Sequence, residues 1–387
     1  MKGYFSYDAG WLEQQHALHT AREIWQQPDL WAVLHQQLIA QQAQYDAFLA
    51  PLLQNPRLQI ILCGAGSSAF AGRALAPWLR EKTGRDVVAY GTTDIVANPQ
   101  QFLDPTRPTL LVSFARSGNS PESVASVALA DQLLPHCYHL MVVCNPDSQL
   151  ANYGHGRKNV CALVMPQGSN DQSFAMTSSF SCMMLTTALL LGPYSLAAAQ
   201  PLMAQMIARC RELRETLQPQ VKALASSGFN RYIVLGSSCF TGLAEEVSLK
   251  MLELTAGKIV TRYDSPLGLR HGPKFMVDPQ TLVLLMLSCN HYTRRYDQDL
   301  WDELQRDGLA KQMVGLGNTP AEKPGQYDLH HAEDDVWLLF PYLLFAQMLA
   351  FETSLAQGLT PDNPCPTGEV NRVVKGVTIY PYSCTAQ

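Results

Sequence analysis

Residues 58–69 read Leu-Gln-Ile-Ile-Leu-Cys-Gly-Ala-Gly-Ser-Ser-Ala, an apolar run that leads directly into a turn rich in glycine and serine. The apolar run predicts a buried strand, and the residues after Ser68 predict a helix that begins at the turn. Backbone amides of such a turn, together with the helix dipole, attract anions. Gly66, Ser67 and Ser68 are therefore candidate ligands of an anionic group. A tight turn that only caps a helix explains the same residues about as well.

The same alternation of short apolar runs and longer helical patterns extends along most of the chain. The candidate strands are 58–63, 87–90, 109–114, 140–144, 161–165, 232–235, 258–263, 281–287, 313–316 and 336–339. This alternation predicts βα units, and therefore an α/β architecture in which helices cover both faces of parallel sheets.

The pattern also repeats within the chain. The Gly-Ser-Ser turn at Gly66 recurs at Gly236, 170 residues later, and two copies of one α/β unit explain this best. The spacing of apolar side chains near the N-terminus is helical. We therefore expect an N-terminal helical arm over 1–50, a first unit over 51–205, and a second unit with a C-terminal tail over 206–387.

Composition narrows the class of protein. The chain has 387 residues, of which 47% are hydrophobic and 16% charged, and its formal net charge is −5. The negative charge argues against binding to nucleic acid or to an anionic membrane. The ten cysteines form no C-x-x-C pair, which favours reduced thiols and a cytoplasmic location. The charge-free stretch 172–208 is broken at Gly192, so we expect a buried helix there rather than a membrane span.

No motif predicts a metal or a cofactor. The sequence lacks H-E-x-x-H, paired cysteines and a spaced acidic loop. Residues 64–69 match the dinucleotide fingerprint G-x-G-x-x-A, but the next candidate strand has no acidic residue at its end to hold a ribose. This weakens a nucleotide-binding interpretation. Residues 330–335 contain two histidines and three acidic side chains that could chelate a metal, and we expect them to form a solvated loop.

A second turn offers more specific chemistry. The candidate strand 109–114 is followed by Ala-Arg-Ser-Gly-Asn-Ser-Pro, in which Ser120 and Pro121 form a helix start. Small hydroxyl and amide groups on such a backbone, with a guanidinium beside them, suit a phosphate. A third hydroxyl cluster precedes the charge-free helix and could close the same pocket. The candidate phosphate ligands of these two segments are Arg116, Ser117, Asn119, Ser120, Thr177 and Ser178.

These features together resemble the sugar isomerase (SIS) domain family. The resemblance rests on the turn at 64–68, the Ser-Gly-Asn-Ser-Pro-Glu loop at 117–122, the segment 245–258 and the Arg-His-Gly-Pro sequence at 270–273, and it spans nearly the whole chain. It implies two flavodoxin-like units, a small phosphosugar as substrate, no cofactor, and a homodimer or larger homo-oligomer. The most similar members act on galactosamine 6-phosphate and tagatose 6-phosphate.

The resemblance also assigns catalytic residues. Glu246, Lys250 and Glu253 are spaced i, i+4 and i+7 and so share one helix face, although by itself such a set is often a mere ion pair. The family match makes Glu253 the base that moves a proton between C1 and C2, with Lys250 beside it. It makes His271 the acid/base that opens the sugar ring, from the neighbouring subunit. It also aligns Lys375 loosely with a lysine that can form a Schiff base.

The implied reaction converts galactosamine 6-phosphate to tagatose 6-phosphate and ammonia by ring opening, proton transfer from C2 to C1 and hydrolysis of a ketimine. Plain aldose–ketose isomerisation uses the same residues and stays an alternative. A phosphosugar-binding regulator without catalysis is a second alternative, although the arm over 1–50 is neither basic nor patterned for a DNA groove. A nucleotide-dependent dehydrogenase is a third.

Overall fold

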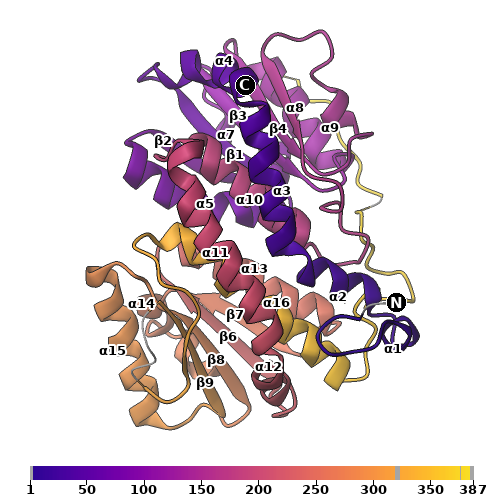
Figure 1. Cartoon of the computed structure of the whole chain (residues 1–387). Helices are drawn as coiled ribbons and strands as arrows, with labels where there is room; N and C mark the ends of the chain where they lie inside the picture. Colours follow the sequence, from indigo (N-terminus) through magenta and orange to yellow (C-terminus); the bar gives the residue numbers. More distant parts are fainter. Residues whose placement is uncertain (1–2, 319–322, 375, 384–387) are drawn as a thin grey trace.

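Two five-stranded parallel sheets organise the chain (Figure 1). The computed structural model describes residues 3–318, 323–374 and 376–383. The strand order is β2-β1-β3-β4-β5 in the first sheet and β7-β6-β8-β9-β10 in the second. Both are the 2-1-3-4-5 order of flavodoxin-like folds, which confirms the predicted α/β class. The strands are β1 (Gln59–Gly64), β2 (Asp86–Gly91), β3 (Thr109–Ala115), β4 (Cys137–Val143), β5 (Val160–Val164), β6 (Arg231–Gly236), β7 (Val260–Asp264), β8 (Thr281–Met286), β9 (Gln312–Gly317) and β10 (Gln326–Asp328).

Helices form an N-terminal arm and pack around the sheets. The arm consists of α1 to α4, which agrees with the helical spacing predicted for the first fifty residues. The helices are α1 (Ala9–Gln14), α2 (Leu18–Trp25), α3 (Gln27–Ala40), α4 (Gln42–Leu53), α5 (Ser67–Thr83), α6 (Thr92–Ala97), α7 (Pro99–Phe102), α8 (Pro121–Leu133), α9 (Gln149–Asn152), α10 (Ser178–Leu191), α11 (Leu196–Thr216), α12 (Gln218–Ala225), α13 (Cys239–Leu254), α14 (Pro266–Leu269), α15 (His291–Asp307) and α16 (Leu339–Ala356), with the 3₁₀ turns η1 (Pro273–Met276) and η2 (Asp335–Trp337).

The central strands of each sheet are buried on both faces. In β1, Ile60 belongs to the large central core, whereas Ile61 belongs to a separate cluster on the opposite face. In β6, Val234 and Leu235 divide in the same way between the central core and a third cluster. Successive residues of a strand point to opposite faces, so a strand that is covered on both sides needs a continuous apolar run. This is the pattern from which the strands were predicted.

The turn after β1 has a counterpart after β6, and the structure corrects the spacing of the repeat. Gly66 has φ +55° and ψ −130°, and Ser238 has φ +55° and ψ −122°. The two equivalent positions are 172 residues apart rather than 170, because Ser238, and not Gly236, occupies the left-handed position of the second turn. A non-glycine residue is uncommon at such a φ. The Gly-Ser-Ser sequence of the second unit therefore lies two residues earlier, relative to the turn, than that of the first unit.

One predicted strand is wrong. Residues 336–339 form the end of η2 and the start of α16, and the fifth strand of the second sheet is instead β10. A short apolar run does not distinguish a buried strand from a buried helix. The stretch 335–356 is long and apolar enough for a membrane span, yet the helical residues are buried within the protein. The charge-free stretch near 178 likewise forms the buried helix α10, as expected, and ends at Gly192.

The two units meet through α5 and α13, which lie between the sheets in Figure 1. A Cβ atom on Gly242 of α13 would lie 2.3 Å from the backbone nitrogen of Ala74 in α5, so only glycine permits this approach. The ion pair between Arg73 and Glu245 joins the same helices at 2.5 Å. Because α5 begins at the carboxyl end of β1, this contact brings residues of α13 close to the carboxyl end of the first sheet.

Candidate active site

The candidate site begins where β1 and β3 end. These neighbouring strands are the switch point of the first sheet, from which the chain leaves toward opposite faces, and ligands of open α/β sheets bind at such points. The turn after β1 needs both of its glycines, because a Cβ on Gly64 would lie 2.5 Å from the Cβ of Ser68 and Gly66 has a positive φ. Ser67 and Ser68 begin α5 and are 4% exposed.

The turn after β3 packs against the loop before α9 and is hydrogen-bonded to it. Gly118 has φ +63°, and a Cβ there would lie 2.3 Å from Oγ of Ser148. Asn145 donates a side-chain hydrogen bond to the carbonyl of Ser117 at 3.3 Å, and Asn119 accepts one from the backbone of Gln149 at 2.9 Å. Ser120 precedes Pro121 in extended conformation, as the predicted helix start requires. The turn is therefore pre-shaped by protein contacts.

Arg116 does not point freely into solvent. The residue is 7% exposed, and its guanidinium donates to the carbonyl oxygens of Phe174 at 3.0 Å and Arg372 at 2.7 Å. Arg372, in the C-terminal tail, donates in turn to the carbonyl of Ser173 at 3.1 Å and to that of Asp171. The two arginines thus tie the tail to the loop before α10. Contact of Arg116 with a phosphate stays a prediction.

The hydroxyl cluster at 177–179 donates hydrogen bonds to a carboxylate of the protein itself, which the sequence analysis did not predict. Asp171, which is fully buried, accepts backbone hydrogen bonds from Thr177 at 2.8 Å, Ser178 at 3.1 Å and Ser179 at 2.9 Å, and also the hydroxyl of Thr177 at 3.1 Å. The Ser178 hydroxyl donates to the carbonyl of Glu23 at 2.6 Å. Asp171 therefore caps α10, and a phosphate contact of Thr177 or Ser178 stays a prediction.

Glu23, a buried carboxylate of the N-terminal arm, is hydrogen-bonded to the loop before α10. Glu23 of α2 is 1% exposed and accepts backbone hydrogen bonds from Gln172 at 2.6 Å and Ser173 at 3.2 Å. Burial, together with the nearby charge of Asp171, raises the pKa of Glu23 to about 7. The N-terminal arm thus helps to shape the wall of the site, which no motif in the sequence indicated.

The predicted acid–base residues meet on one face of α13. Nζ of Lys250 lies 3.6 Å from Oε1 of Glu246 and forms a hydrogen bond with Oε2 of Glu253. The side chains of Glu246 and Lys250 are 0% and 1% exposed, whereas that of Glu253 is 22% exposed. Of the three, Glu253 is the group open to a ligand.

Electrostatics ties this face to the first unit. Burial opposes the charge of Lys250, but the Glu246 and Glu253 carboxylates raise its pKa above the usual value, and Arg116 counteracts them. Burial raises the pKa of Glu246 to about 8 although Lys250 counteracts it. Ser67 lies near enough to influence Glu246, yet neither carboxylate oxygen of Glu246 has a hydrogen-bond partner of good geometry within the described residues. The structure thus brings Ser67, Arg116, Lys250 and Glu253 together.

His271 lies apart from this group in the single chain. It follows α14 in an exposed turn in which Gly272 has φ +117°. Within the described residues, only its backbone forms a hydrogen bond, to the carbonyl of Gly268 at 3.0 Å. Phe275 beside it is 94% exposed. Lys375, the other predicted catalytic residue, lies outside the described residues.

The corresponding turns of the second unit are occupied by the protein's own carboxylates. Asp297, fully buried, accepts the Ser237 hydroxyl at 2.7 Å and the Ser288 backbone N–H at 2.9 Å. Asp335 accepts the Ser288 hydroxyl at 2.6 Å and the Cys289 backbone N–H at 2.7 Å. In the first unit, no hydrogen bond within the described residues joins the turn 116–120 to a carboxylate. Within the described residues, the turn 116–120 of the first unit therefore has no carboxylate of the protein where the second unit has Asp335.

The chain is similar to known proteins over nearly its whole length. The SIS domain model matches residues 52–192. The chain is 42% identical to D-galactosamine-6-phosphate deaminase AgaS of Shewanella sp. strain ANA-3, over 96% of this chain and 94% of that protein. A crystal structure of tagatose-6-phosphate ketose/aldose isomerase from Escherichia coli has a TM-score of 0.87 at 40% identity and covers 94% of this chain and 97% of its own. A crystal structure described as a tagatose-6-phosphate ketose/aldose isomerase from Clostridium novyi NT has a TM-score of 0.95 at 38% identity. The match covers 99% of this chain and 100% of that one.

Proposed function

Because this chain belongs to the SIS domain family, together with the deaminase and isomerase that it matches over nearly their full length, we propose that it converts galactosamine 6-phosphate to tagatose 6-phosphate and ammonia. The observation that carries this proposal is the face of α13, where Lys250 holds the partly exposed carboxylate of Glu253 beside the hydroxyl-lined turns of the first unit. The enzyme class follows from the same face, because a regulator that only binds sugar does not need an acid–base pair there.

The phosphate of the substrate is held where β1 and β3 end. Ser67 and Ser68 supply hydroxyls at the start of α5, and Ser117, Asn119 and Ser120 supply polar groups before α8. Two helix N-termini converge there, and both favour a negative charge. Arg116 adds a buried positive charge to the same crevice. Thr177 and Ser178 lie at the start of α10, where Asp171 holds their backbone N–H groups and so fixes the loop beside the phosphate.

The reaction needs one base that serves two adjacent carbons. After the ring opens, Glu253 removes the proton from C2 of the aldehyde form and returns it to C1. The oxygen on C1 takes up a proton and the amine gives one up, so the aminoaldehyde becomes a ketimine with a hydroxyl on C1. Water then adds at C2, and ammonia leaves as the C2 ketone forms. Lys250 orients the Glu253 carboxylate and supplies a positive charge near the developing enolate oxygen. C1 is reduced as C2 is oxidised, so no net redox change occurs and the chemistry requires no external oxidant.

Ring opening is assigned to His271 of a second subunit. In one chain the imidazole stands in an exposed turn, beside Phe275 and Leu267, which are 94% and 47% exposed. Apolar side chains exposed to this degree are typical of surfaces that another protein covers. A homodimer or larger assembly in the cytoplasm therefore accounts for both the apolar side chains and the missing ring-opening group. Lys375 stays a candidate for contact with the open-chain sugar.

The release of ammonia tests the function. The purified protein is incubated with galactosamine 6-phosphate, and ammonia and tagatose 6-phosphate are measured together; the proposal predicts equal amounts of both. The similarity to the Escherichia coli tagatose-6-phosphate ketose/aldose isomerase keeps plain isomerisation as a second candidate. Turnover between galactose 6-phosphate and tagatose 6-phosphate without ammonia from the amino sugar would replace deamination by isomerisation.

A further inference from the structure

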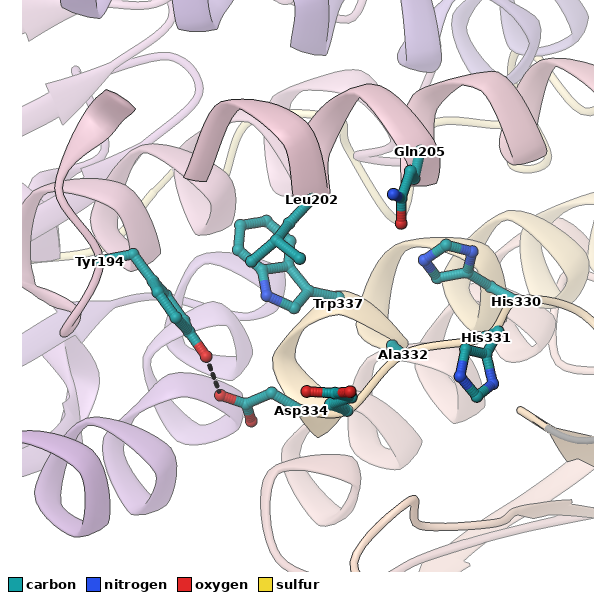
Figure 2. A pocket seen from close by; sticks show the side chains of 9 residues that line it. Tyr194, Leu202, Gln205, His330, His331, Ala332, Asp334 and Trp337 are labelled. Carbon is teal, nitrogen blue, oxygen red and sulfur yellow. Dashed lines mark hydrogen bonds between the residues drawn. The ribbon is translucent and has the colours of Figure 1, made fainter. Parts of the chain in front are cut away.

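A cavity lies between α11 and the loop that follows β10, away from the acid–base face of α13. Its volume is about 310 Å³, and it is enclosed by α11, the turn before it, and the loop that follows β10 (Figure 2). Asp334 in this loop accepts a hydrogen bond from Nε1 of Trp78 at 2.9 Å. Trp78 lies ten residues beyond Ser68 in α5, which is about 15 Å at 1.5 Å per residue. The cavity is therefore separate from the active site.

His330 lines this cavity as a buried polar side chain whose ring has no hydrogen-bond partner within the described residues. The sequence suggested a solvated loop here, but His330 is 8% exposed, and its ring forms no hydrogen bond within the described residues. Figure 2 shows the imidazole extending from the loop toward Gln205 and Trp337. Burial, together with the charge of Arg209, lowers the pKa of His330 to about 4. At neutral pH the ring therefore offers one donor and one acceptor, and buried polar groups normally have partners.

The charges around the cavity are predominantly negative. Asp334 and Glu333 both line it, and Asp334 also accepts the Tyr194 hydroxyl at 3.1 Å. Two cations act on these residues from outside the lining. Burial opposes the charge of Lys82, but Asp334 and Glu81 raise its pKa, and Lys82 pairs with Glu81 at 3.2 Å; Arg209 pairs with Glu212 at 2.8 Å. A phosphate would be repelled here, whereas an ammonium group would be attracted.

The aromatic side chains define the shape of the ligand. The rings of Tyr194 and Trp337 lie 5.9 Å apart at 45°, and both line the cavity. Aromatic faces attract cations and pack against apolar ring faces. Nε1 of Trp337 is buried and has no hydrogen-bond partner among the described residues. The volume is at the lower end of the range for small-ligand pockets, roughly 300–1,000 Å³, so a single six-membered sugar ring suits it.

We propose that this cavity is a binding site for an amino sugar without a phosphate. The ammonium group pairs with Glu333 and Asp334, the hydroxyls bond to His330 and Gln205, and the ring packs against Trp337. This cavity would bind a cationic group, whereas the hydroxyls and helix N-termini of the proposed catalytic site would bind an anion. The two sites therefore distinguish the phosphorylated from the unphosphorylated form of one class of sugar.

Calorimetric titration of the full-length protein with galactosamine tests this site. We expect saturable binding that is about tenfold weaker with galactose, which has a hydroxyl in place of the ammonium group, since a charged hydrogen bond contributes about that factor. Glu333→Gln should weaken galactosamine binding by a similar factor. The matched control Glu215→Gln removes the same charge from an exposed position of α11 and should leave binding unchanged.

Two further variants separate this site from the catalytic one. Gln205→Trp places an indole over the cavity from an exposed position of α11 and should abolish galactosamine binding. Glu253→Gln should bind galactosamine as the parent does, because its carboxylate lies in the other site. Turnover of galactosamine 6-phosphate should be unchanged in Glu333→Gln, so failure of this proposal leaves the proposed function intact. No binding by the parent, equal binding of galactose, or an unchanged affinity in Glu333→Gln would overturn the assignment.

Discussion

Replacing Glu246 with glutamine should make the stability of the protein less dependent on pH. The side chain is 0% exposed, and its carboxylate oxygens have no hydrogen-bond partner within the described residues. Burial raises its pKa from an ordinary 4.5 to about 8, although the ammonium of Lys250 opposes this. The folded state therefore keeps the proton over a pH range in which the unfolded chain has already released it.

The sign and size of the effect follow from this difference. Between about pH 4.5 and pH 8 the folded parent binds one more proton than the unfolded chain, so its free energy of unfolding falls as the pH rises. With a pKa of about 8 in the folded protein and 4.5 in the unfolded chain, the loss is roughly 4–5 kcal/mol. Glutamine does not titrate and avoids this loss. Glu246→Gln should equal the parent within about 1 kcal/mol at pH 5 and exceed it by about 3–5 kcal/mol at pH 9.

Urea unfolding of both proteins at pH 5, 7 and 9 measures the difference. Glu81→Gln is the control, because that side chain is 63% exposed and its replacement should change the free energy of unfolding by no more than about 0.5 kcal/mol at any of these pH values. A difference between Glu246→Gln and the parent that stays constant from pH 5 to pH 9 would refute the reasoning. It would mean that Glu246 stays ionised beside Lys250.

Further predictions concern single contacts. Asp171→Ala leaves the N–H groups at the start of α10 without acceptors and should cost about 3 kcal/mol or more in urea unfolding; an unchanged midpoint would contradict the capping role. Gly242→Ala forces a Cβ against the backbone of α5 and should destabilise by about 2–3 kcal/mol in the same assay; parental stability would show that the helices can separate freely. Glu253→Gln should slow ammonia release by about 10²–10⁴-fold with a nearly parental KM, and a rate within tenfold of the parent would exclude it as the base. Mixing Glu253→Gln with His271→Ala subunits should restore activity that neither variant has alone, whereas no recovery in mixed oligomers would place both groups in one subunit.

The sequence was most informative where one residue pattern permits a single structure. Short apolar runs identified nine of the ten strands that the structure describes, including the largely exposed β7, and the spacing of Glu246, Lys250 and Glu253 correctly placed them on one helix face. Both features are local, because they depend on periods of two and 3.6 residues. The strand β10 was missed because it has three residues, two of them polar.

The contacts that shape the site were not predictable in this way. Asp171 caps α10 from six to eight residues upstream, through a loop whose path no periodicity describes. Glu23 reaches the same loop from the N-terminal arm, 150 residues away from Ser173. Arg116 has a long side chain with several possible acceptors, and the carbonyls of Phe174 and Arg372 become available only in the folded chain. Long-range packing, rather than local pattern, decides such partners.

The fate of the hydrogen at C2 tests the central claim most directly. Galactosamine 6-phosphate that carries deuterium at C2 is turned over by the parent and by Glu253→Gln, and the products are examined by NMR at short times. If Glu253 carries one proton between the two carbons, the parent releases ammonia and part of the deuterium appears at C1 of tagatose 6-phosphate, whereas the variant transfers almost none. Equal transfer of deuterium to C1 by Glu253→Gln, at the rate of the parent, would contradict the mechanism, because another group would then carry the proton.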